Sequence, residues 1–341
     1  MTDDMTYRQV LRKVMAGESL GRAETHAAFG QIMAGQWSEP QIAGLLVALA
    51  VKGETVEEIA GAAEAMRDHV VRIDTDGRDV IDTCGTGGTG LSTFNVSTAA
   101  ALVAAGGGAT VAKHGNVTHT RASGSANVLA SLGVKLDADP PTITRCLAEA
   151  GVCFCFAIRH HPAMKYAAPV RKALGVRTLF NVLGPLTNPA GARRQVMGIF
   201  DGALTETIAR VLGALGAERA LVVHADDGLD EIATTAETRI SEWRNGQVAT
   251  RTVCPEDFSL PRARLEDLLV DSPEASAATI LEVLAGKTGP ARDIVVLNAA
   301  AALAVAGKAD SIADALPLAE QSIDTGAASS ALEKLVEVSN E

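Results

Sequence analysis

Short apolar runs of strand-forming residues alternate with alanine-rich helical stretches from about residue 79 onward, and this alternation constrains the fold more than any other feature. Runs such as ALVVHA suit strands that are covered on both faces. Strands that alternate with helices are typical of α/β architecture with a mainly parallel central sheet. The expected strands are 80–84, 109–113, 152–158, 195–200 and 220–225, and the expected helices are 96–106, 124–132, 141–150, 203–215, 274–286, 291–306 and 327–338.

The first 75 residues show helix signals only. Glycines at 17, 35 and 53 each follow an apolar helical stretch, as glycines that end helices do. Ser38 before Glu39-Pro40 is typical of a helix start, and TVEE at 55–58 has the pattern of a capping box. We therefore expect four short helices in a small N-terminal helical domain, residues 1–75, ahead of the α/β domain. Later in the chain, Asn245-Gly246 predicts a hairpin with a type I′ turn.

Composition disfavours several classes of protein. Aromatic residues make up only 3% of the chain and the net charge is −11, which disfavours nucleic acid as a partner. There is no apolar run of roughly eighteen residues that would span a membrane, and the N-terminal sequence does not have the pattern of a secretory signal. Five unevenly spaced cysteines indicate a reduced protein, and we expect a cytoplasmic one. Cys153 and Cys155 would share one strand face, where burial in the core is favoured over a metal pair.

A glycine-rich turn between an expected strand and helix is the strongest local signal. Residues 85–90 read GTGGTG, and Asn95, Ser97 and Thr98 follow at the start of the helix. Glycines let backbone N–H groups converge on an anion, and a helix N-terminus adds unpaired donors. The spacing is neither that of a Walker loop nor that of a dinucleotide motif. The pattern predicts a phosphate or diphosphate site.

Further polar residues follow the next strand, at the sheet edge where α/β folds place ligands. Lys113 would supply a positive charge for phosphate, and Asn116 a group that donates and accepts. Taken alone, His114 is more typical of a structural histidine than of a ligand-binding one. Arg121, Ser123 and Ser125 follow in a second turn into a helix and form a second candidate anion pocket.

Two more segments carry charged candidates. Arg171 can hold a carboxylate with two hydrogen bonds, or it can form an ordinary surface ion pair. Adjacent His160 and His161 would point about 100° apart on a helix, which disfavours a shared metal. Residues 226–231 read DDGLDE after a strand; Asp230 and Glu231 suit an oxygen-ligated Mg²⁺, or the segment is an acidic surface loop.

At this point the chain resembles the anthranilate phosphoribosyltransferase family. The resemblance runs from the N-terminal helices to beyond residue 235 and rests on GTGGTG with NVST, KHGN, SGSANVL, DGLDE and the run HHPAMKYAAPVRKALGVRTLFNVLGPLTNPA. It implies transfer of the phosphoribosyl group of phosphoribosyl pyrophosphate (PRPP) to anthranilate, in tryptophan biosynthesis, with Mg²⁺ as cofactor. It also implies a homodimer through the helical domain, to which residues 168–190 return, leaving 76–167 and 191–341 as the α/β domain.

The resemblance assigns site residues by position. Those implied to hold PRPP are Gly85, Gly88, Thr89, Thr93, Asn95, Val96, Ser97, Thr98, Lys113, His114, Gly115, Asn116, Arg121 and Ser125. Those implied to contact anthranilate are Gly85, Asn116 and Arg171. Those implied to hold Mg²⁺ are Ser97, Asp230 and Glu231. No side chain is implied as a nucleophile.

The sequence departs from the family pattern around both substrates. The departures are Thr89, Val117, His119, Thr120, Arg121, Asn127 and Ile158. Two alternatives therefore stay open: a paralogue with another aromatic or heteroaromatic acceptor, and a non-catalytic member that binds nucleic acid. Acidic net charge and the acids of DGLDE disfavour the latter. A nucleoside phosphorylase is disfavoured because the chain is short for one.

Overall fold

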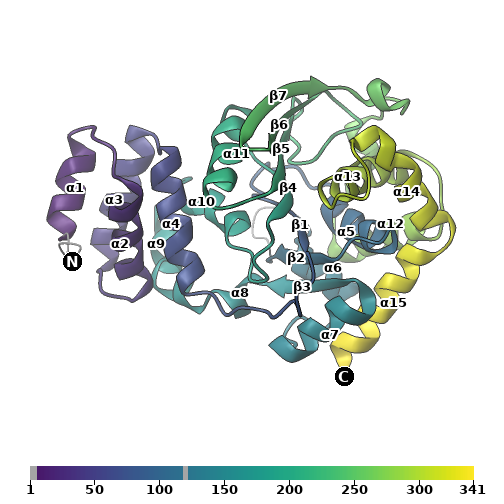
Figure 1. The fold of residues 1–341 in the computed structure, drawn as a ribbon, viewed down its shortest axis with the longest axis horizontal. Coiled ribbons are helices and arrows are strands. Elements are labelled where there is room, and N and C mark those ends of the chain that lie inside the picture. The colour runs from purple at the N-terminus through teal and green to yellow at the C-terminus, as the bar shows by residue number, and fades with distance from the viewer. Residues whose placement is uncertain (1–5, 118–121) are drawn as a thin grey trace.

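The computed structural model describes residues 6–117 and 122–341. Within these residues the strands form one seven-stranded sheet in the order β3-β2-β1-β4-β5-β6-β7 (Figure 1). The first five strands are parallel, and β6 and β7 are added as an antiparallel hairpin. The strands are β1 (Ile81–Gly85), β2 (Val111–Gly115), β3 (Val152–Phe156), β4 (Arg194–Gly198), β5 (Arg219–Ala225), β6 (Thr238–Arg244) and β7 (Gln247–Val253). The predicted α/β class, the five parallel strands and the hairpin are confirmed.

The register brings the carboxyl ends of the parallel strands to one edge of the sheet. Gly85 at the end of β1 is level with Gly198 at the end of β4, and Gly115 at the end of β2 is level with Phe156 at the end of β3. The loops that follow these strands therefore meet, and this edge is where ligands bind in such sheets.

One face of the sheet is covered by the alanine-rich helices. Because alanine side chains are short, α5 and α13 pack closely against each other and against the strands. Helix α14 is missing from the sequence-based expectation; it contains Pro317, a residue that normally argues against a continuous helix. These helices are α5 (Val96–Gly106), α6 (Ser125–Ser131), α7 (Pro140–Ala150), α12 (Pro273–Leu284), α13 (Pro290–Val305), α14 (Ile312–Asp324) and α15 (Ala327–Asn340).

The other face of the sheet is covered by α11 (Thr205–Ala214), and the N-terminal bundle packs against α11 through α4. The period-two pattern of β5 serves both faces, since Leu221 and Val223 enter the first core while Ala220 and Val222 enter the second. That second core continues without interruption through α11 into the N-terminal bundle. The bundle helices are α1 (Tyr7–Met15), α2 (Arg22–Met33), α3 (Glu39–Lys52) and α4 (Val56–Asp68).

Later residues return to this bundle. Helix α9 packs against α3, and α10 contacts α4. The short helices of this return are α8 (Ala157–His160), η1 (Pro162–Tyr166), α9 (Ala168–Leu174), α10 (Phe180–Leu183) and η2 (Gly184–Leu186). The remaining 3₁₀ helices are η3 (Gly202–Leu204), η4 (Pro255–Phe258) and η5 (Leu265–Leu268).

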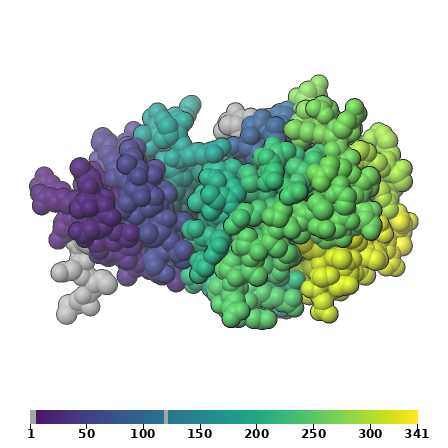
Figure 2. All heavy atoms as spheres, turned by 90° about the horizontal axis from the view of Figure 1, so that it is seen from above, coloured from purple at the N-terminus to yellow at the C-terminus, as the bar shows by residue number. Residues whose placement is uncertain are grey.

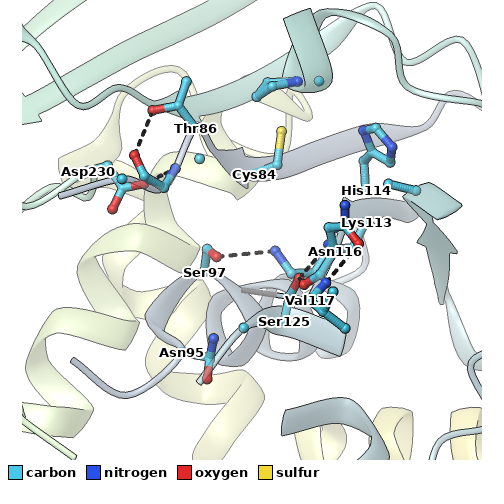
Figure 3. Close-up of a pocket in the computed structure, with 18 of the residues that line it drawn as sticks. Cys84, Thr86, Asn95, Ser97, Lys113, His114, Asn116, Val117, Ser125 and Asp230 are labelled. Carbon is cyan, nitrogen blue, oxygen red and sulfur yellow. Dashed lines mark hydrogen bonds between the residues drawn. The ribbon is translucent and has the colours of Figure 1, made fainter. Parts of the chain in front are cut away.

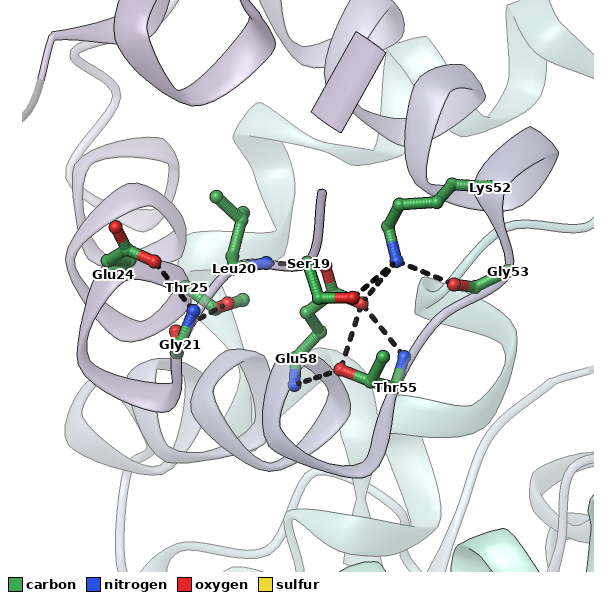
Figure 4. Close-up of polar contacts among 9 residues, drawn as sticks. All are labelled: Ser19, Leu20, Gly21, Glu24, Thr25, Lys52, Gly53, Thr55 and Glu58. Atoms are coloured by element: carbon green, nitrogen blue, oxygen red, sulfur yellow. Dashed lines mark hydrogen bonds and ion pairs between the residues drawn. The ribbon is translucent and has the colours of Figure 1, made fainter. Parts of the chain in front are cut away.

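A buried carboxylate joins two turns of the bundle (Figure 4). Glu58 is fully buried and accepts hydrogen bonds from the backbone N–H of Leu20 at 2.9 Å and of Thr55 at 2.8 Å. Lys52 pairs with it at 2.9 Å. The predicted capping box is thus present, and its glutamate also fixes the turn between α1 and α2.

The molecule is elongated, with the N-terminal helices at one end and the C-terminal residues at the other (Figure 2). In the described part of the chain, no helix has both the length and the apolar character needed to cross a membrane.

Candidate active site

A cleft of about 410 Å³ opens at the carboxyl edge of the sheet, between the loops after β1, β2 and β5 and the segment from α9 to η2. It is lined by the glycine loop after β1, by Lys113 on β2 and by the acids after β5 (Figure 3). The predicted residues that line it are Gly85, Gly88, Asn95, Ser97, Lys113, His114, Gly115, Asn116, Ser125, Arg171, Asp230 and Glu231.

The glycine loop needs its glycines for conformation. Gly87, Gly88 and Gly90 have φ values of 63°, 76° and 77°, in the left-handed region that other residues rarely adopt. The loop is anchored at its start, where Thr86 Oγ1 accepts the backbone N–H of Phe200 at 3.0 Å. This is a loop of defined shape whose backbone can face an anion.

An arginine ties this loop to the segment on the other side of the cleft. Arg177, between α9 and α10, donates from Nη2 to the carbonyl oxygen of Gly88 at 2.7 Å. Its guanidinium also lies over the ring of Phe200, 4.2 Å from the centroid. The loop is therefore fixed from outside the cleft, by a contact that no local sequence pattern predicts.

The cationic group of the cleft is Lys113 on β2, which is only 2% exposed. Its Nζ donates to the carbonyl oxygen of Thr83 and to Ser97 Oγ at 3.2 Å (Figure 3). Burial lowers the pKa of Lys113, and the charge of the buried Asp82 opposes that shift. Asp82 is held by Asn188 at 2.7 Å and by the backbone N–H of His114 at 3.0 Å. Asp82 thus stabilises the charged form of Lys113 and, through the backbone N–H of His114, holds the strand that carries the lysine.

Two carboxylates lie across from this lysine, on the loop after β5. Asp230 and Glu231 are 6% and 7% exposed, and both are close enough to Lys113 to raise its pKa. Asp230 Oδ2 accepts the backbone N–H of Gly87 at 2.9 Å, which joins the acidic loop to the glycine loop.

The donor set around these acids fits Mg²⁺. Ser97, Asp230 and Glu231 together line a small cavity of about 20 Å³ beside the main cleft. Within residues 6–117 and 122–341, no three His, Cys, Asp or Glu side chains are placed so that they could hold a metal ion together, so a zinc-type site is not formed there. Two carboxylates and a hydroxyl suit Mg²⁺, which binds few protein oxygens and keeps several waters.

The two adjacent histidines point to different partners. His160 Nδ1 lies 2.7 Å from the carbonyl oxygen of Val71, in the linker between α4 and β1. His161 Nε2 lies 3.2 Å from His114 Nε2, in the wall of the cleft. Burial lowers the pKa of His161 to about 4 and that of His114 well below its ordinary value, so both imidazoles are neutral at pH 7.

Arg171 on α9 reaches the cleft from the opposite side. Its guanidinium lies 5.7 Å from the ring centroid of Phe180, and burial lowers its pKa. Among the described residues it has no carboxylate partner, so the alternative of a surface ion pair is not observed. A guanidinium that lines a cleft and has no carboxylate partner is suited to bind an anionic ligand.

Some predicted residues do not line the cleft. Val96 and Thr98 are 1% exposed within α5, Thr93 is 4% exposed beside Leu269, and Thr89 lies in the loop but not in the wall. Arg121 lies outside the described residues.

Other residues line the cleft without having been predicted. Four of them, Phe180, Asn181, Gly184 and Pro185, come from the stretch after Arg171, and the others lie beside predicted residues in the loops after β1, β2 and β3. They are Thr86, Gly87, Phe94, Val117, Gly124, Ala157, Phe180, Asn181, Gly184 and Pro185, with Cys84 beneath the glycine loop. Ser123, from the second candidate anion pocket, lines the cleft as well.

Comparisons with known proteins agree with this architecture. Residues 8–70 match the family model described as "Glycosyl transferase family, helical bundle domain", and residues 77–329 match "Glycosyl transferase family, a/b domain". The chain is 50% identical to an anthranilate phosphoribosyltransferase of Thioalkalivibrio sulfidiphilus, over 97% of this chain and 98% of the relative. It is 51% identical to that of Moorella thermoacetica, over 96% of each.

Solved structures give the same result. The crystal structure of anthranilate phosphoribosyltransferase from Thermus thermophilus has a TM-score of 0.93 and 42% identity, covering 97% of this chain and 99% of that one. The enzyme of Saccharomyces cerevisiae in complex with PRPP and Mg has a TM-score of 0.89 and 27% identity, covering 99% of both chains. The full length of these matches and the identity of about one residue in two show that the chain belongs to the anthranilate phosphoribosyltransferase family.

Proposed function

We propose that the cleft transfers the ribose 5-phosphate group of PRPP to the amino group of anthranilate and releases pyrophosphate. The observation that carries this proposal is that two anion-binding walls face one cavity. The glycine loop and Lys113 form one wall, and the half-buried Arg171 lies in the other. PRPP is a polyanion and anthranilate carries one carboxylate, so each wall has a suitable ligand.

PRPP is held by the loops after β1 and β2. The backbone of Gly85 and Gly88, the start of α5 at Asn95, and Ser125 supply hydrogen-bond donors to phosphate oxygens. Lys113 places its charge against the leaving pyrophosphate. Thr93, Val96 and Thr98 contribute by fixing the loop and the first turn of α5, since their side chains are buried.

Mg²⁺ is held by Asp230, Glu231 and Ser97. When bound, the ion neutralises charge on the pyrophosphate, which makes it a better leaving group. Asp230 also keeps the acidic loop against the glycine loop by accepting the hydrogen bond from the backbone N–H of Gly87.

Anthranilate binds with its carboxylate on Arg171 and its amine near Asn116. Asn116 follows β2 and lies in the cleft wall, where its backbone N–H donates to Ser125 Oγ at 3.2 Å. The two contacts orient the amine toward the sugar bound on the other wall.

In the reaction the amine nitrogen forms a bond to C1 of the ribose while the bond from C1 to the pyrophosphate oxygen breaks. The pyrophosphate leaves with the electron pair and is released as an anion, and the amine gives up one proton to the surrounding water. Positive charge develops on the sugar, so catalysis consists of positioning and charge stabilisation, and no protein nucleophile is needed.

The test is the loss of anthranilate fluorescence on incubation with PRPP and Mg²⁺. Turnover that needs both additions supports the assignment. If the protein binds PRPP in calorimetry yet consumes no anthranilate over hours, the acceptor is wrong and other aromatic amines become the candidates.

The family also supports a homodimer through the helical domain, in a cytoplasmic enzyme of tryptophan biosynthesis. Apolar residues are exposed on the bundle, with Val47 at 41% and Val51 at 84% on α3 and Met15 at 72% on α1. The proposed domain division is 1–75 with 168–190 against 76–167 with 191–341. Sedimentation of the wild type and of Val51→Glu tests the dimer, because a charge on a buried contact would yield monomers.

A further inference from the structure

Three side chains from separate parts of the chain, Asn95, Ser123 and Ser276, meet at the wall of the cleft. Asn95 at the start of α5 accepts at Oδ1 from Ser276 Oγ at 2.8 Å and from Ser123 Oγ at 2.6 Å. Ser276 lies on α12 and is fully buried, and Ser123, in the loop before α6, is 3% exposed. Only Asn95 and Ser123 line the cleft itself, so Ser276 acts from behind.

The hydrogen bonds of Ser276 determine which way the amide of Asn95 points. The backbone N–H of Asn95 donates to Ser276 Oγ at 2.9 Å, so the serine has already accepted one hydrogen bond from this residue. Its single hydroxyl proton then goes to Oδ1 of Asn95. With the amide reversed, the hydroxyl protons of Ser276 and Ser123 would both face an NH₂ group and lose their acceptor.

The fixed amide therefore presents donors only. Both Oδ1 lone pairs are used, and one Nδ2 proton goes to the carbonyl oxygen of Ser123 at 3.3 Å. The other Nδ2 proton is left for a ligand in the cleft that Asn95 lines. A donor without a competing acceptor suits a phosphate oxygen.

The backbone before Ser276 supports the same stretch. Phe94 N–H donates to the carbonyl oxygen of Leu268 at 3.0 Å, and Val270 N–H donates to that of Ser92 at 2.8 Å. Residues 268–276 thus run beside residues 92–95 and hold them at both ends.

We propose that Ser276 is a positioning residue for PRPP binding, which fixes Asn95 as a hydrogen-bond donor and joins the loops after β1 and β2 through it. The proposal rests on the proposed function, because it takes PRPP as the ligand of Asn95. Ser276 touches no substrate and acts only through Asn95.

The experiment compares Ser276→Ala with Ser272→Ala. Ser272 caps the same helix by accepting the backbone N–H of Ala275 at 3.1 Å and makes no contact with Asn95. Ser272→Ala removes the cap of α12 and tests whether a general effect on this helix changes binding, whereas Ser276→Ala removes the hydrogen bond that orients the amide of Asn95. We expect Ser276→Ala to raise the PRPP KM about tenfold, as loss of one well-placed hydrogen bond does, with kcat and the anthranilate KM within about twofold of wild type. Ser272→Ala keeps all three values.

A double-mutant cycle tests whether the effect passes through Asn95. In an Asn95→Ala background, Ser276→Ala should raise the PRPP KM much less than in wild type, because only the backbone N–H of residue 95 still bonds to Ser276. An unchanged PRPP KM in the single variant, or an equal rise in both backgrounds, would overturn the proposal. Wild-type protein that does not convert anthranilate would instead contradict the proposed function, and PRPP calorimetry on the same variants then tests Ser276 without turnover.

Discussion

Oδ2 of Asp230 occupies the space that a side chain on Gly85 would need. A Cβ atom at residue 85 would lie less than 3.0 Å from that oxygen, and a Cβ at Gly198 would lie less than 3.0 Å from the backbone oxygen of Asp230. Two strands thus end in glycine side by side, and the acidic loop is seated directly on them. The absence of side chains at 85 and 198 allows the carboxylate to reach the glycine loop.

Gly85→Ala is therefore expected to displace Asp230 and leave the fold intact. Gly85 is not in the left-handed region, so alanine adds no backbone strain there. A displacement of about 1 Å at a catalytic group can cost about 10²-fold in rate. Steady-state kinetics and circular dichroism measure the two effects. Gly30→Ala, in α2 with no atom near its Cβ position, is the control and should keep full activity.

Removing both acidic charges should abolish turnover. Asp230→Asn with Glu231→Gln keeps size and hydrogen bonding but removes the charge that Mg²⁺ requires. Asp226→Asn, an exposed acid at the start of the same loop, is the matched control and should be active. Full activity of the double variant in excess EDTA would exclude Mg²⁺ from the reaction.

Arg171→Ala should affect the acceptor more than PRPP. A charged hydrogen bond to a carboxylate is worth about 1.5–3 kcal/mol, which corresponds to roughly 10- to 150-fold in the anthranilate KM. The PRPP KM should change less, because Arg171 is on the opposite wall. Lys172→Ala changes the exposed neighbour and should change neither value. An equal rise in both constants would place Arg171 elsewhere in the mechanism.

Acid should destabilise the protein through the histidine pair. The pKa of His161 falls from 6.5 to about 4 on folding, chiefly because of burial. Between these two values the unfolded chain binds a proton that the folded chain does not, so stability falls as pH is lowered from 6.5 to 4. A shift of this size amounts to about 3 kcal/mol at the acid end, and His114 adds a contribution of the same sign.

Urea unfolding at pH 7 and pH 4.5 measures this loss. His161→Gln should lose less stability between the two pH values than wild type does. The exposed His26, changed to Gln, should behave as wild type. Parallel losses in all three proteins would show that other groups cause the acid sensitivity.

The fold was largely readable from the sequence because its signals are local. Buried strands such as β5 and the Asn245-Gly246 turn carry their pattern within a few residues, and the strands occur close to where they are expected. Helix α14 was not predicted, since Pro317 interrupts its pattern while tertiary packing against α13 stabilises it. The core shared by the bundle and the sheet was not predictable either, because it depends on which faces meet in space.

The sequence predicted residues that line the cleft, but it did not predict the residues that hold those cleft residues in place. Lys113, Asn95 and Asp230 belong to recognisable motifs at strand ends, and they all line one cleft. The contacts of Ser276 and Arg177 join residues 181 and 89 positions apart. A serine in a helix and an arginine in a turn are common, so only the three-dimensional contact distinguishes them.

The core that α1–α4 share with α11 and one face of the sheet also bears on synthesis of the chain. The bundle leaves the ribosome first, yet Met197, Ile199 and Ile208, which complete its core, follow only after β1, β2 and β3 have been made. Until then the bundle keeps an apolar face open to water, and β1 lacks its neighbour β4. We therefore expect chaperone binding and aggregation to compete most strongly with folding after the bundle has been made and before β4 and α11 have been made.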